Sequence, residues 1–225
     1  MNETFIITAG STREFIDPVR FITNRSSGKM GYALAQAAKD RGAKVILISG
    51  PSNISPPAGI DIIKVQTAEA MRQQVLSHLN QSTVLIMAAA VSDYRPSAPS
   101  KQKIKKKLSK WSLEMEPTVD ILSEISKRSA KQLLVGFAAE TENIISNAKK
   151  KLKQKKLHLI VANDITLKDS GFESDYGTVS LLDKYGEVKN LPRLPKRQIA
   201  EIILDKIEEL LRDERARSKR ANKPS

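Results

Sequence analysis

The fold class of this chain is decided by three consecutive segments: Phe5-Ile-Ile-Thr8, Lys29-Met-Gly-Tyr-Ala-Leu-Ala-Gln-Ala-Ala-Lys-Asp-Arg41 and Val45-Ile-Leu-Ile48. The first and third are short, apolar and rich in β-branched residues, which favours buried strands. The middle segment carries its apolar side chains at helical spacing, and Gly42 behind it is a typical helix stop. A strand, a helix and a strand in this order predict the first unit of a parallel sheet.

The same alternation continues along most of the chain. Short apolar runs bounded by turn residues predict further strands, and segments with helical spacing predict helices between them. Continuous apolar strands are typical of a parallel sheet that is buried on both faces. The sequence therefore predicts an α/β fold with a Rossmann-like, doubly wound parallel sheet. The predicted strands are 60–65, 84–87, 133–137 and 157–161, and the predicted helices are 68–79, 142–156 and 196–211.

Two stretches interrupt the alternation, residues 92–117 and residues 165–194. The first is rich in lysine and holds three of the ten prolines. The second contains a predicted strand at 177–182 that leads into a hairpin turn. Long ordered excursions usually serve a site or an interface. We interpret both as flap or dimerisation regions attached to a single Rossmann-like domain, residues 1–211.

The composition excludes several kinds of site. The chain has no cysteine and only two histidines, His78 and His158. A disulfide scaffold, a thiolate zinc site and a cysteine nucleophile are therefore excluded, and a histidine metal cluster or a Ser-His-Asp triad is disfavoured. No apolar run approaches the length of a membrane span, and the first residues do not resemble a signal peptide, so we expect a cytoplasmic protein. Its chemistry must come from Lys, Asn, Asp, Ser and backbone groups.

The formal net charge of +13 is concentrated in three patches. Residues 101–110 and residues 149–156 carry six lysines each, and residues 212–225 carry six basic residues against two acidic ones. Basic patches favour polyanionic ligands such as nucleotides, phosphorylated metabolites or nucleic acid. The last patch has no apolar anchor, and we expect residues 212–225 to form a flexible basic tail.

Two alternative functions fit the motifs less well. A nucleic-acid-binding protein would interleave aromatic residues with its basic patches, but the chain has one Trp, four Tyr and five Phe, and none lies within 101–110. We therefore expect no nucleic-acid partner. A dehydrogenase would carry G-x-G-x-x-G after its first strand and an acid after its second, and neither occurs. The P-loop pattern is also missing.

The clearest candidate site is Asn24-Arg-Ser-Ser-Gly-Lys-Met-Gly31. Ser26, Ser27 and Gly28 fall at the start of a predicted helix, where free N–H groups and the helix dipole attract a phosphate. A plain helix cap with Ser27 as the capping residue is the alternative. Ligands of a parallel sheet bind outside the carboxyl ends of its strands, so we expect the residues that follow other strands, such as 88–90 and 162–164, to lie nearby.

Seven segments in register then resemble one family, the phosphopantothenoylcysteine synthetases. These are CTP-dependent phosphopantothenate–cysteine ligases of bacterial coenzyme A biosynthesis. The resemblance runs from about residue 5 to residue 210, and seven motifs in order make it highly specific. The segments are Thr-Ala-Gly-Ser-Thr-Arg-Glu at 8–14, Asp-Pro-Val-Arg at 17–20, Thr-Asn-Arg-Ser-Ser-Gly-Lys-Met-Gly at 23–31, Ala-Ala-Val-Ser-Asp-Tyr-Arg at 89–95, Lys-Ile-Lys-Lys at 103–106, Gly-Phe-Ala-Ala-Glu-Thr at 136–141 and Ala-Asn-Asp at 162–164.

The resemblance implies a two-step ligase reaction. The carboxylate of 4′-phosphopantothenate attacks the α-phosphate of CTP, which gives an acyl-cytidylate and pyrophosphate. The amine of L-cysteine then displaces CMP and forms phosphopantothenoylcysteine. The resemblance also implies a homodimer and Mg²⁺ bound with the nucleotide, without identifying the metal ligands. Many bacterial members are fused behind a flavin-dependent decarboxylase, so we expect either a free-standing ligase with a separate decarboxylase or one half of such a protein.

The resemblance further implies the site residues. Asn24 closes over the acyl-cytidylate and Lys103 contacts the phosphates, so these are the expected catalytic residues. Ser26 belongs to the phosphate-binding helix start described above. The family writes Pro-Asp-Ile-Leu at the turn 119–122, where this chain has Val119 in place of the proline. The remaining expected CTP contacts are Met87, Ala88, Ala89, Asp93, Val119, Asp120, Ile121, Leu122, Phe137, Lys151 and Lys155, and Lys151 and Lys155 also share one face of a predicted helix.

Overall fold

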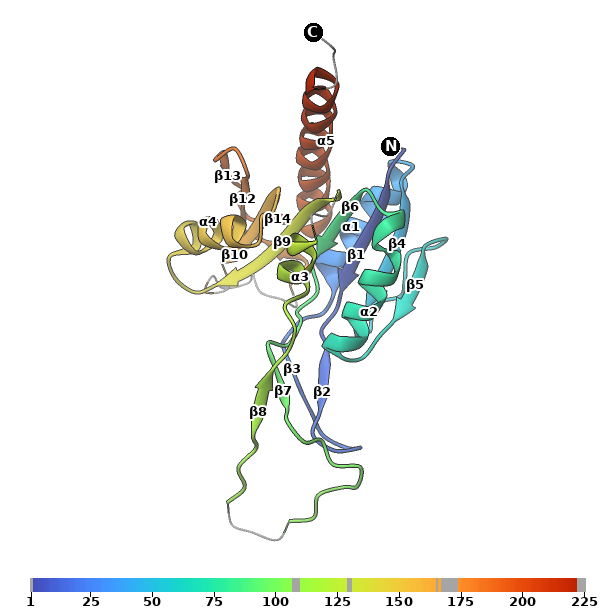
Figure 1. Ribbon diagram of the computed structural model, residues 1–225, viewed down its shortest axis with the longest axis vertical. Coiled ribbons are helices and arrows are strands. Elements are labelled where there is room, and N and C mark those ends of the chain that lie inside the picture. Colours follow the sequence, from blue (N-terminus) through green and yellow to red (C-terminus); the bar gives the residue numbers. More distant parts are fainter. Residues whose placement is uncertain (1, 107–109, 129–130, 165, 167–173, 222–225) are drawn as a thin grey trace.

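The computed structural model describes residues 2–106, 110–128, 131–164, 166 and 174–221, and its centre is an eight-stranded sheet in the order β13-β12-β10-β9-β6-β1-β4-β5 (Figure 1). The strands from β10 to β5 in this order are parallel to their neighbours. This confirms the predicted Rossmann-like α/β sheet. The strands are β1 (Thr4–Ala9), β4 (Lys44–Ser49), β5 (Asp61–Lys64), β6 (Val84–Met87), β9 (Leu133–Glu140), β10 (Leu159–Asp164), β12 (Val179–Asp183) and β13 (Val188–Asn190).

Helices cover both faces of the sheet. α1 (Lys29–Asp40) and α5 (Lys196–Ala221) pack on one face, where Phe5 and Ile7 of β1 point. α2 (Ala68–His78), α3 (Ile121–Lys127) and α4 (Ile144–Gln154) pack on the other face, to which Ile6 points. Successive strand side chains alternate between faces, so an all-apolar strand must be covered twice. The doubly wound arrangement follows from that requirement.

The edge of the sheet differs from the prediction. We interpreted residues 165–194 as an excursion, but β12 and β13 within that range join the main sheet antiparallel to their neighbours. The predicted strand 177–182 is divided between β12 and β11 (Tyr176–Gly177), and β11 pairs instead with β14 (Leu194–Pro195) in a separate two-stranded sheet. The hairpin turn was predicted correctly. The direction of its strands is set by that short turn, which forces antiparallel pairing.

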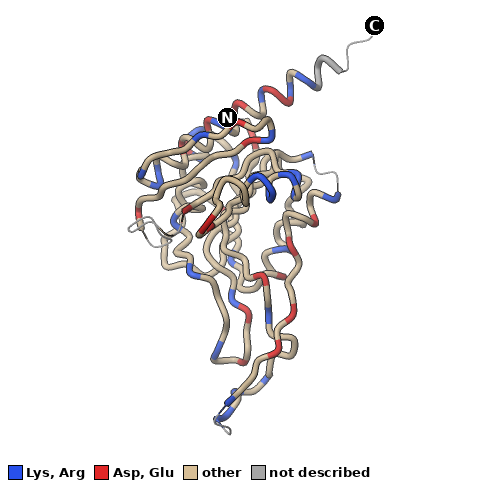
Figure 2. The backbone as a smooth tube through the Cα atoms, turned by 90° about the vertical axis from the view of Figure 1, so that its left-hand side faces the viewer, with Lys and Arg blue, Asp and Glu red and all other residues tan. Residues whose placement is uncertain are grey.

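The last helix is also longer than predicted. It was expected to end at Leu211, but α5 continues to Ala221 and extends beyond the body of the molecule (Figures 1 and 2). Ion pairs hold its far part to the body, among them Lys184 with Glu214 and Arg215 with Glu3. Residues 212–221 are therefore helical rather than irregular, and residues 222–225 of the expected tail lie outside the described residues.

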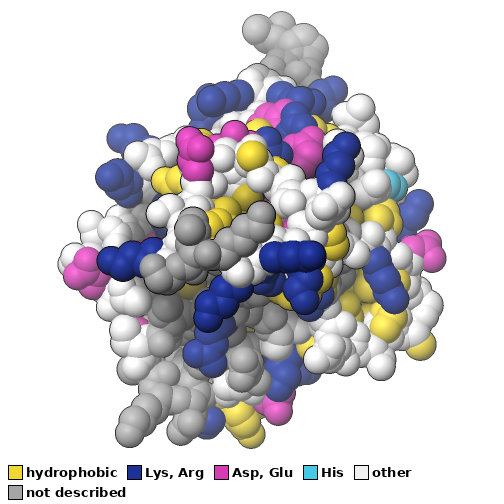
Figure 3. All heavy atoms as spheres, turned by 90° about the horizontal axis from the view of Figure 1, so that it is seen from below, with side chains coloured by type: hydrophobic (Ala, Val, Ile, Leu, Met, Phe, Trp, Pro, Cys, Tyr) yellow, Lys and Arg dark blue, Asp and Glu magenta, His cyan; other side chains and the backbone are white. Residues whose placement is uncertain are grey.

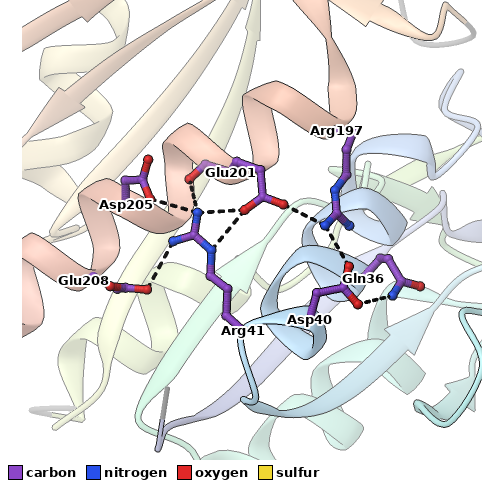
Figure 4. Close-up of polar contacts among 7 residues, drawn as sticks. All are labelled: Gln36, Asp40, Arg41, Arg197, Glu201, Asp205 and Glu208. Atoms are coloured by element: carbon purple, nitrogen blue, oxygen red, sulfur yellow. Dashed lines mark hydrogen bonds and ion pairs between the residues drawn. The ribbon is translucent and has the colours of Figure 1, made fainter.

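α1 and α5 are joined by a network of charged side chains (Figure 4). The guanidinium of Arg41, which follows α1, lies 2.7 Å from Glu201, 2.8 Å from Asp205 and 3.1 Å from Glu208. At the rim of the network Arg197 pairs with Asp40 at 2.7 Å. These contacts join the carboxyl end of α1 to α5.

A long arm projects from the body, on the side away from both chain ends (Figure 1). It consists of two antiparallel hairpins, β2 (Arg13–Phe15) with β3 (Phe21–Thr23) and β7 (Tyr94–Pro96) with β8 (Met115–Pro117). The excursion at 92–117 was therefore predicted correctly as a departure from the sheet, whereas no strand was predicted where β2 and β3 lie. Figure 2 shows basic residues gathered towards the end of the arm.

The arm has its own internal anchor. The buried carboxylate of Asp17 accepts hydrogen bonds from the backbone N–H groups of Val19 (2.9 Å), Arg20 (2.9 Å) and Ile104 (3.1 Å), and from the Arg20 guanidinium. The Arg20 hydrogen bond, opposed by burial and reinforced by the backbone donors, holds the pKa of Asp17 well below its ordinary range. One carboxylate thus ties the β2–β3 loop to residue 104.

Candidate active site

A cleft of about 480 Å³ opens where the strand order reverses direction. From β1 the chain proceeds to β4 and β5 on one side, and then crosses to β6, β9 and β10 on the other side. The loops that follow β1 and β6 must therefore separate, which leaves a crevice outside the carboxyl ends of the strands. The cleft lies at that place, and its walls come from the residues after β6, the start of α1, the end of β9, β10 and the start of α5.

Small residues bring backbone groups to the middle of the cleft. A Cβ atom on Gly31 would lie 2.6 Å from the Cβ of Ala9, so only glycine lets α1 approach β1 this closely. On the opposite wall the Ala90 N–H donates to the Gly10 carbonyl at 2.9 Å, and the Ala89 N–H donates to the Thr8 hydroxyl at 3.1 Å. The loop after β6 is thereby fixed against β1, and its small side chains leave room for a flat ligand.

The amino end of α1 forms one end of the cleft. Gly28 is the N-cap with a φ of 84°, a left-handed conformation that favours glycine, and no side chain caps the helix. The alternative interpretation, a plain helix cap with Ser27 as the capping residue, is therefore wrong. The Ser26 and Ser27 hydroxyls instead accept from the N–H groups of Gly28 (3.3 Å) and Lys29 (3.4 Å). The first N–H groups of a helix have no intrahelical acceptor, so this end can bind an anion.

Basic side chains dominate the walls of the cleft. Arg25, Lys29, Lys151 and Lys196 line it, and Asp93 is the one acid among its described lining residues. Figure 3, in which the arm points towards the viewer, shows that Lys and Arg side chains also gather on the arm side of the molecule. Some of these charges are partly compensated, because Lys29 lies 2.6 Å from Asp175 and Lys151 lies 2.7 Å from Glu140. The remaining positive potential favours a ligand with several negative charges.

Lys196 differs from the other cations of the cleft. Burial and then the charge of Lys29 lower the pKa of its ammonium group to about 8, and the charge of Asp175 opposes both effects. In β10 the Oδ1 atom of Asn163 is buried and accepts no hydrogen bond from the described residues.

Asn24 lies on the loop that leads from the arm into α1. Its Nδ2 atom donates to the carbonyl of Val91 at 3.1 Å, on the opposite side of the cleft. Thr23 donates to the carbonyl of Thr12 at 2.7 Å and fixes the same loop one residue earlier. The loop therefore spans the cleft with an amide side chain facing inwards.

Half of the expected site residues line this cleft. They come from several elements, with Phe137 and Lys151 on β9 and α4 and the others on the loops around β1 and β6. The residues that the structure brings together are Asn24, Ser26, Ala88, Ala89, Asp93, Phe137 and Lys151.

The other expected residues lie elsewhere. Residues 119–122 were expected to form a turn, but Asp120 is the N-cap of α3, and its carboxylate accepts from the Ser123 N–H at 3.0 Å. Ile121 and Leu122 are buried residues of α3, as Met87 is of β6, while Val119 is 50% exposed. A helix forms here because Ile121, Leu122 and Ile125 recur at helical spacing and need a core to face. Their side chains fill the core rather than the cleft.

Two expected lysines are also separate from the cleft walls. Lys155 caps the end of α4 and pairs with Asp120 at 2.7 Å. Burial alone would raise the pKa of Asp120, but the hydrogen bonds from Lys155 and Ser123 outweigh it and hold the pKa below its ordinary value. Lys103 lies on the arm, beside the Ile104 anchor, and is not among the residues that line the cleft of its own chain.

Four lining residues lie outside every candidate segment and motif of the sequence: Gly177, Val179, Lys196 and Ile199. They come from β11, β12 and the first turn of α5, which are brought to the cleft by the β11–β14 pairing. One signal was available in the sequence, because Lys196 follows Pro195 at the predicted start of the last helix. Helix starts at a sheet edge are common anion sites, but nothing local placed this one beside α1.

The described part of the chain offers no preformed metal centre. Among the residues searched, no group of three or more His, Asp and Glu side chains is placed to hold an ion. Within the same residues, no helix combines the length and the apolar character needed to cross a bilayer.

Comparisons with known proteins agree with this architecture. Residues 1–211 match the model of the DNA/pantothenate metabolism flavoprotein C-terminal domain. The Coenzyme A biosynthesis bifunctional protein CoaBC of Bacillus subtilis is 47% identical over 214 residues, which are 95% of this chain and 53% of that protein. The chain thus spans about half the length of the curated relatives it matches.

Solved structures give the same result. The crystal structure of the C-terminal domain of a Coenzyme A biosynthesis bifunctional protein CoaBC is 44% identical, has a TM-score of 0.81, and matches over 94% of this chain and 96% of that one. A Cab2 variant in complex with phosphopantothenate-cysteine is 15% identical with a TM-score of 0.76, over 95% of this chain and 89% of that one, and shares the fold. The match to the family model and the identity to its bacterial relatives both show that this chain belongs to the DNA/pantothenate metabolism flavoprotein C-terminal domain family.

Proposed function

We propose that the protein is a ligase that joins 4′-phosphopantothenate to L-cysteine, with CTP as the activating nucleotide, in coenzyme A biosynthesis. The observation that carries the proposal is the cleft at the reversal of strand order. It brings an amide lid residue, a small-residue wall, an aromatic ring and an anion-binding helix start into one space. Relatives named for coenzyme A biosynthesis share 39–47% identity with the chain over about nine-tenths of its length or more, which supports the pathway.

The two ends of the cleft suit two different substrates. Phe137 and the backbone of Ala88 and Ala89 suit a flat base, because a ring can stack on it and exposed backbone groups can donate to and accept from its edge. Lys151 stands on the same wall and suits a phosphate oxygen. The amino end of α1, with Ser26 and Lys29, suits the phosphate of the acid substrate at the other end.

In the first step a carboxylate oxygen of 4′-phosphopantothenate bonds to the α-phosphorus of CTP. The bond from that phosphorus to the bridging oxygen breaks, and pyrophosphate leaves with the electron pair. In the second step the amine of cysteine bonds to the acyl carbon, the acyl–oxygen bond breaks, and CMP leaves. One proton departs from the attacking amine, and the cleft supplies Asn24 to orient the acyl oxygen because an amide both donates and accepts.

The cleft fits Mg²⁺ only as a companion of the nucleotide. Asp93 is the one carboxylate among the described lining residues, and Mg²⁺ often binds through one or two carboxylates, several waters and substrate phosphates. Mg²⁺ bound in this way would offset the charge of the triphosphate. Asp93 is the residue of this chain that would hold it, and the basic side chains around it would stabilise the departing pyrophosphate.

We also propose a homodimer in which the arm completes the partner's cleft. Several large apolar side chains of the arm are exposed, including Val19 (59%), Tyr94 (56%) and Trp111 (51%). Exposed apolar surface of this kind usually marks an interaction site. Lys103 stands on the same arm, away from the cleft of its own chain, and in a dimer it would reach the phosphates of the neighbouring site.

The remaining partner is the source of the acid substrate. Curated relatives are about twice the length of this chain and are bifunctional by name. We propose that a flavin-dependent decarboxylase, either separate or joined to this sequence, acts in the same pathway, and that both activities are cytoplasmic.

The test is pyrophosphate release from each of the four nucleoside triphosphates with 4′-phosphopantothenate and Mg²⁺, followed by amide formation on addition of cysteine. CTP should support both steps and ATP should support them poorly. A matched pair of variants checks the cleft, because Lys151→Met should raise the KM for CTP while Lys150→Met, on the exposed side of the same helix, should not. Comparable rates with all four nucleotides would contradict the cytidine assignment, and no release with any of them would contradict the ligase.

A further inference from the structure

We propose that a groove between α4 and the β12–β13 hairpin is a docking site for an acidic segment of another protein. The segment would place carboxylates on a row of lysines and an apolar side chain on the floor beside them. The groove has a volume of about 670 Å³ and shares no described lining residue with the candidate active site. The proposal concerns a protein partner and does not depend on the ligase function.

The floor of the groove is apolar because the sheet continues past the helix that covers it. α4 packs on β9, β10 and β12, and β13 lies beyond β12 at the edge of the sheet. Leu182 of β12 is paired with Val188 of β13, so both side chains lie on the face of the sheet that carries α4. Leu182 is buried, but Val188 is 36% exposed. An apolar side chain from a partner would cover Val188.

Lysines of α4 border this floor. Lys149 and Lys153 line the groove, and their spacing of four positions puts them on one face of the helix. Like charges at this spacing repel each other, and Lys149 lies outside the last turn, where the helix dipole favours a cation. Helix stability therefore does not account for the pair. Figure 2, in which the α4 side of the molecule faces the viewer, shows a cluster of basic residues on this helix.

A third lysine reaches the groove directly after the helix. Lys156 has a φ of 47°, a left-handed conformation that favours glycine. The Leu157 N–H donates to the Leu152 carbonyl at 2.9 Å and closes the helix around this residue. A lysine in this conformation carries backbone strain that glycine would avoid, and it adds a third positive charge to the groove. We call Lys149, Lys153 and Lys156 the lysine rim.

The acidic residues of the groove do not neutralise the lysine rim. Asp183 and Glu187 line the groove, but both pair with Lys206 of α5, at 3.0 and 2.5 Å. Lys184, the remaining cation of the lining, pairs with Glu214. Within the part of the chain that the structure describes, no acidic side chain forms an ion pair with the lysine rim. The charge of the rim is therefore available to a partner.

These features together favour a peptide over other polyanions. Single-stranded nucleic acid stacks its bases on aromatic side chains, and the described lining of the groove contains none. A membrane-binding face inserts its apolar residues into lipid, whereas Leu157 and Leu182 are buried in the floor. An acidic segment with an apolar residue complements both the rim and the floor. Among the described strands β13 has β12 as its one neighbour, so its outer edge also offers backbone hydrogen bonds to such a segment.

The test is the binding of a fluorescent peptide of alternating glutamate and leucine to the whole protein, measured by anisotropy. The wild type should bind the peptide saturably, with a Kd that rises as salt is added. A peptide with glutamine in place of every glutamate should bind much more weakly. Hydrogen exchange in the complex should slow at residues 149–157 and 182–190. Absence of saturable binding, or protection only outside these residues, would overturn the proposal.

Two variants with equal loss of charge separate the lysine rim from the general basicity of the protein. The rim variant combines Lys149→Gln, Lys153→Gln and Lys156→Gln. The control variant changes three exposed lysines outside the groove and combines Lys44→Gln, Lys64→Gln and Lys150→Gln. The rim variant should raise the Kd of the acidic peptide roughly 10-fold, and the control variant should bind as the wild type does. Equal changes in the two variants would overturn the proposal.

A change on the floor tests the apolar contact. Val188→Glu places a negative charge beside the expected carboxylates and should weaken binding at least as much as the rim variant, whereas Val188→Leu keeps an apolar side chain and should bind normally. Because Val188 is partly exposed at the sheet edge, both variants should fold. Equal binding by both variants would remove the floor from the site and overturn the proposal.

Competition experiments identify the kind of ligand and its place. An excess of CTP should not displace the acidic peptide, and displacement would place the peptide in the active-site cleft instead. Single-stranded DNA and phosphatidylserine vesicles should bind the wild type no better than they bind the rim variant. Tight binding of either that is lost in the rim variant would assign the groove to nucleic acid or to a membrane and overturn the peptide proposal.

Discussion

Replacing Arg41 by methionine should lower the stability of the protein without lowering its activity. The Arg41 guanidinium makes hydrogen bonds to the carboxylate of Glu201 at 2.7 and 3.0 Å, to the carbonyl of Glu201 at 3.0 Å and to Glu208 at 3.1 Å, and it pairs with Asp205 at 2.8 Å. Methionine keeps the hydrophobic stem but leaves three carboxylates on one face of α5 without their shared cation.

The size of the loss follows from the exposure of the network. The Arg41 side chain is 22% exposed, whereas Glu201, Asp205 and Glu208 are 34%, 68% and 39% exposed. Hydrogen bonds to charged groups contribute about 1.5–3 kcal/mol when buried and much less at the surface. We therefore expect a loss of about 2 kcal/mol in the free energy of unfolding. For a chain of this size that lowers the Tm by roughly 4–8 °C.

The assay is thermal and urea unfolding of the variant beside Arg197→Met. Arg197 is 43% exposed, and such surface pairs contribute less than about 1 kcal/mol, so this control should lose less than half as much. Arg41 follows the far end of α1, about 18 Å from the amino end that faces the cleft, so turnover at 25 °C should stay at the wild-type rate. Equal losses for the two variants would refute the assignment of Arg41 as the anchor between α1 and α5.

Three further outcomes are expected. The Asn24→Asp side chain cannot donate to the Val91 carbonyl and places a negative charge over the acyl-cytidylate, so amide formation should fall more than pyrophosphate release. Mass analysis of quenched reactions should then detect the accumulated acyl-cytidylate. An equal fall in both steps would contradict this role of Asn24. Lys103→Gln should slow the first step roughly 10²–10³-fold. If the arm serves the partner's cleft, a mixture of the Lys103→Gln and Asn24→Asp variants should regain activity, because one cleft of each heterodimer then has both native residues. No recovery of activity would place Lys103 outside that site. Burial, reinforced by the charge of Lys184, lowers the pKa of His158 below its ordinary value of 6.5. The contribution of His158 to stability is therefore complete above pH 6.5 and is lost as the pH falls. Between pH 7.5 and pH 5.5 the free energy of unfolding should fall less in His158→Gln than in the wild type.

Most of the regular elements could be predicted because their signals are local. β1, β6 and α1 begin and end within two residues of the predicted limits, since apolar runs and helical spacing are set by neighbours in the sequence. The place of the cleft also followed from sequence order, because parallel strands all end at the same edge. The strands of the arm escaped prediction because β2, β3, β7 and β8 are three residues each, too short to show a period.

The sequence by itself determined which residue types were present for chemistry: it excluded thiol sites and disfavoured histidine sites. Only the tertiary structure decided what the individual charges do. Lys151 and Lys155 are equivalent in the sequence pattern, yet one lines the cleft and the other pairs with Asp120 on α3. In the sequence Lys196 is an ordinary first residue of a predicted helix. In the structure the pairing of β11 with β14 places Lys196 close to Lys29. The pKa and the partner of a charged side chain depend on groups within a few ångströms in space, and those groups lie up to about 170 positions away in the sequence.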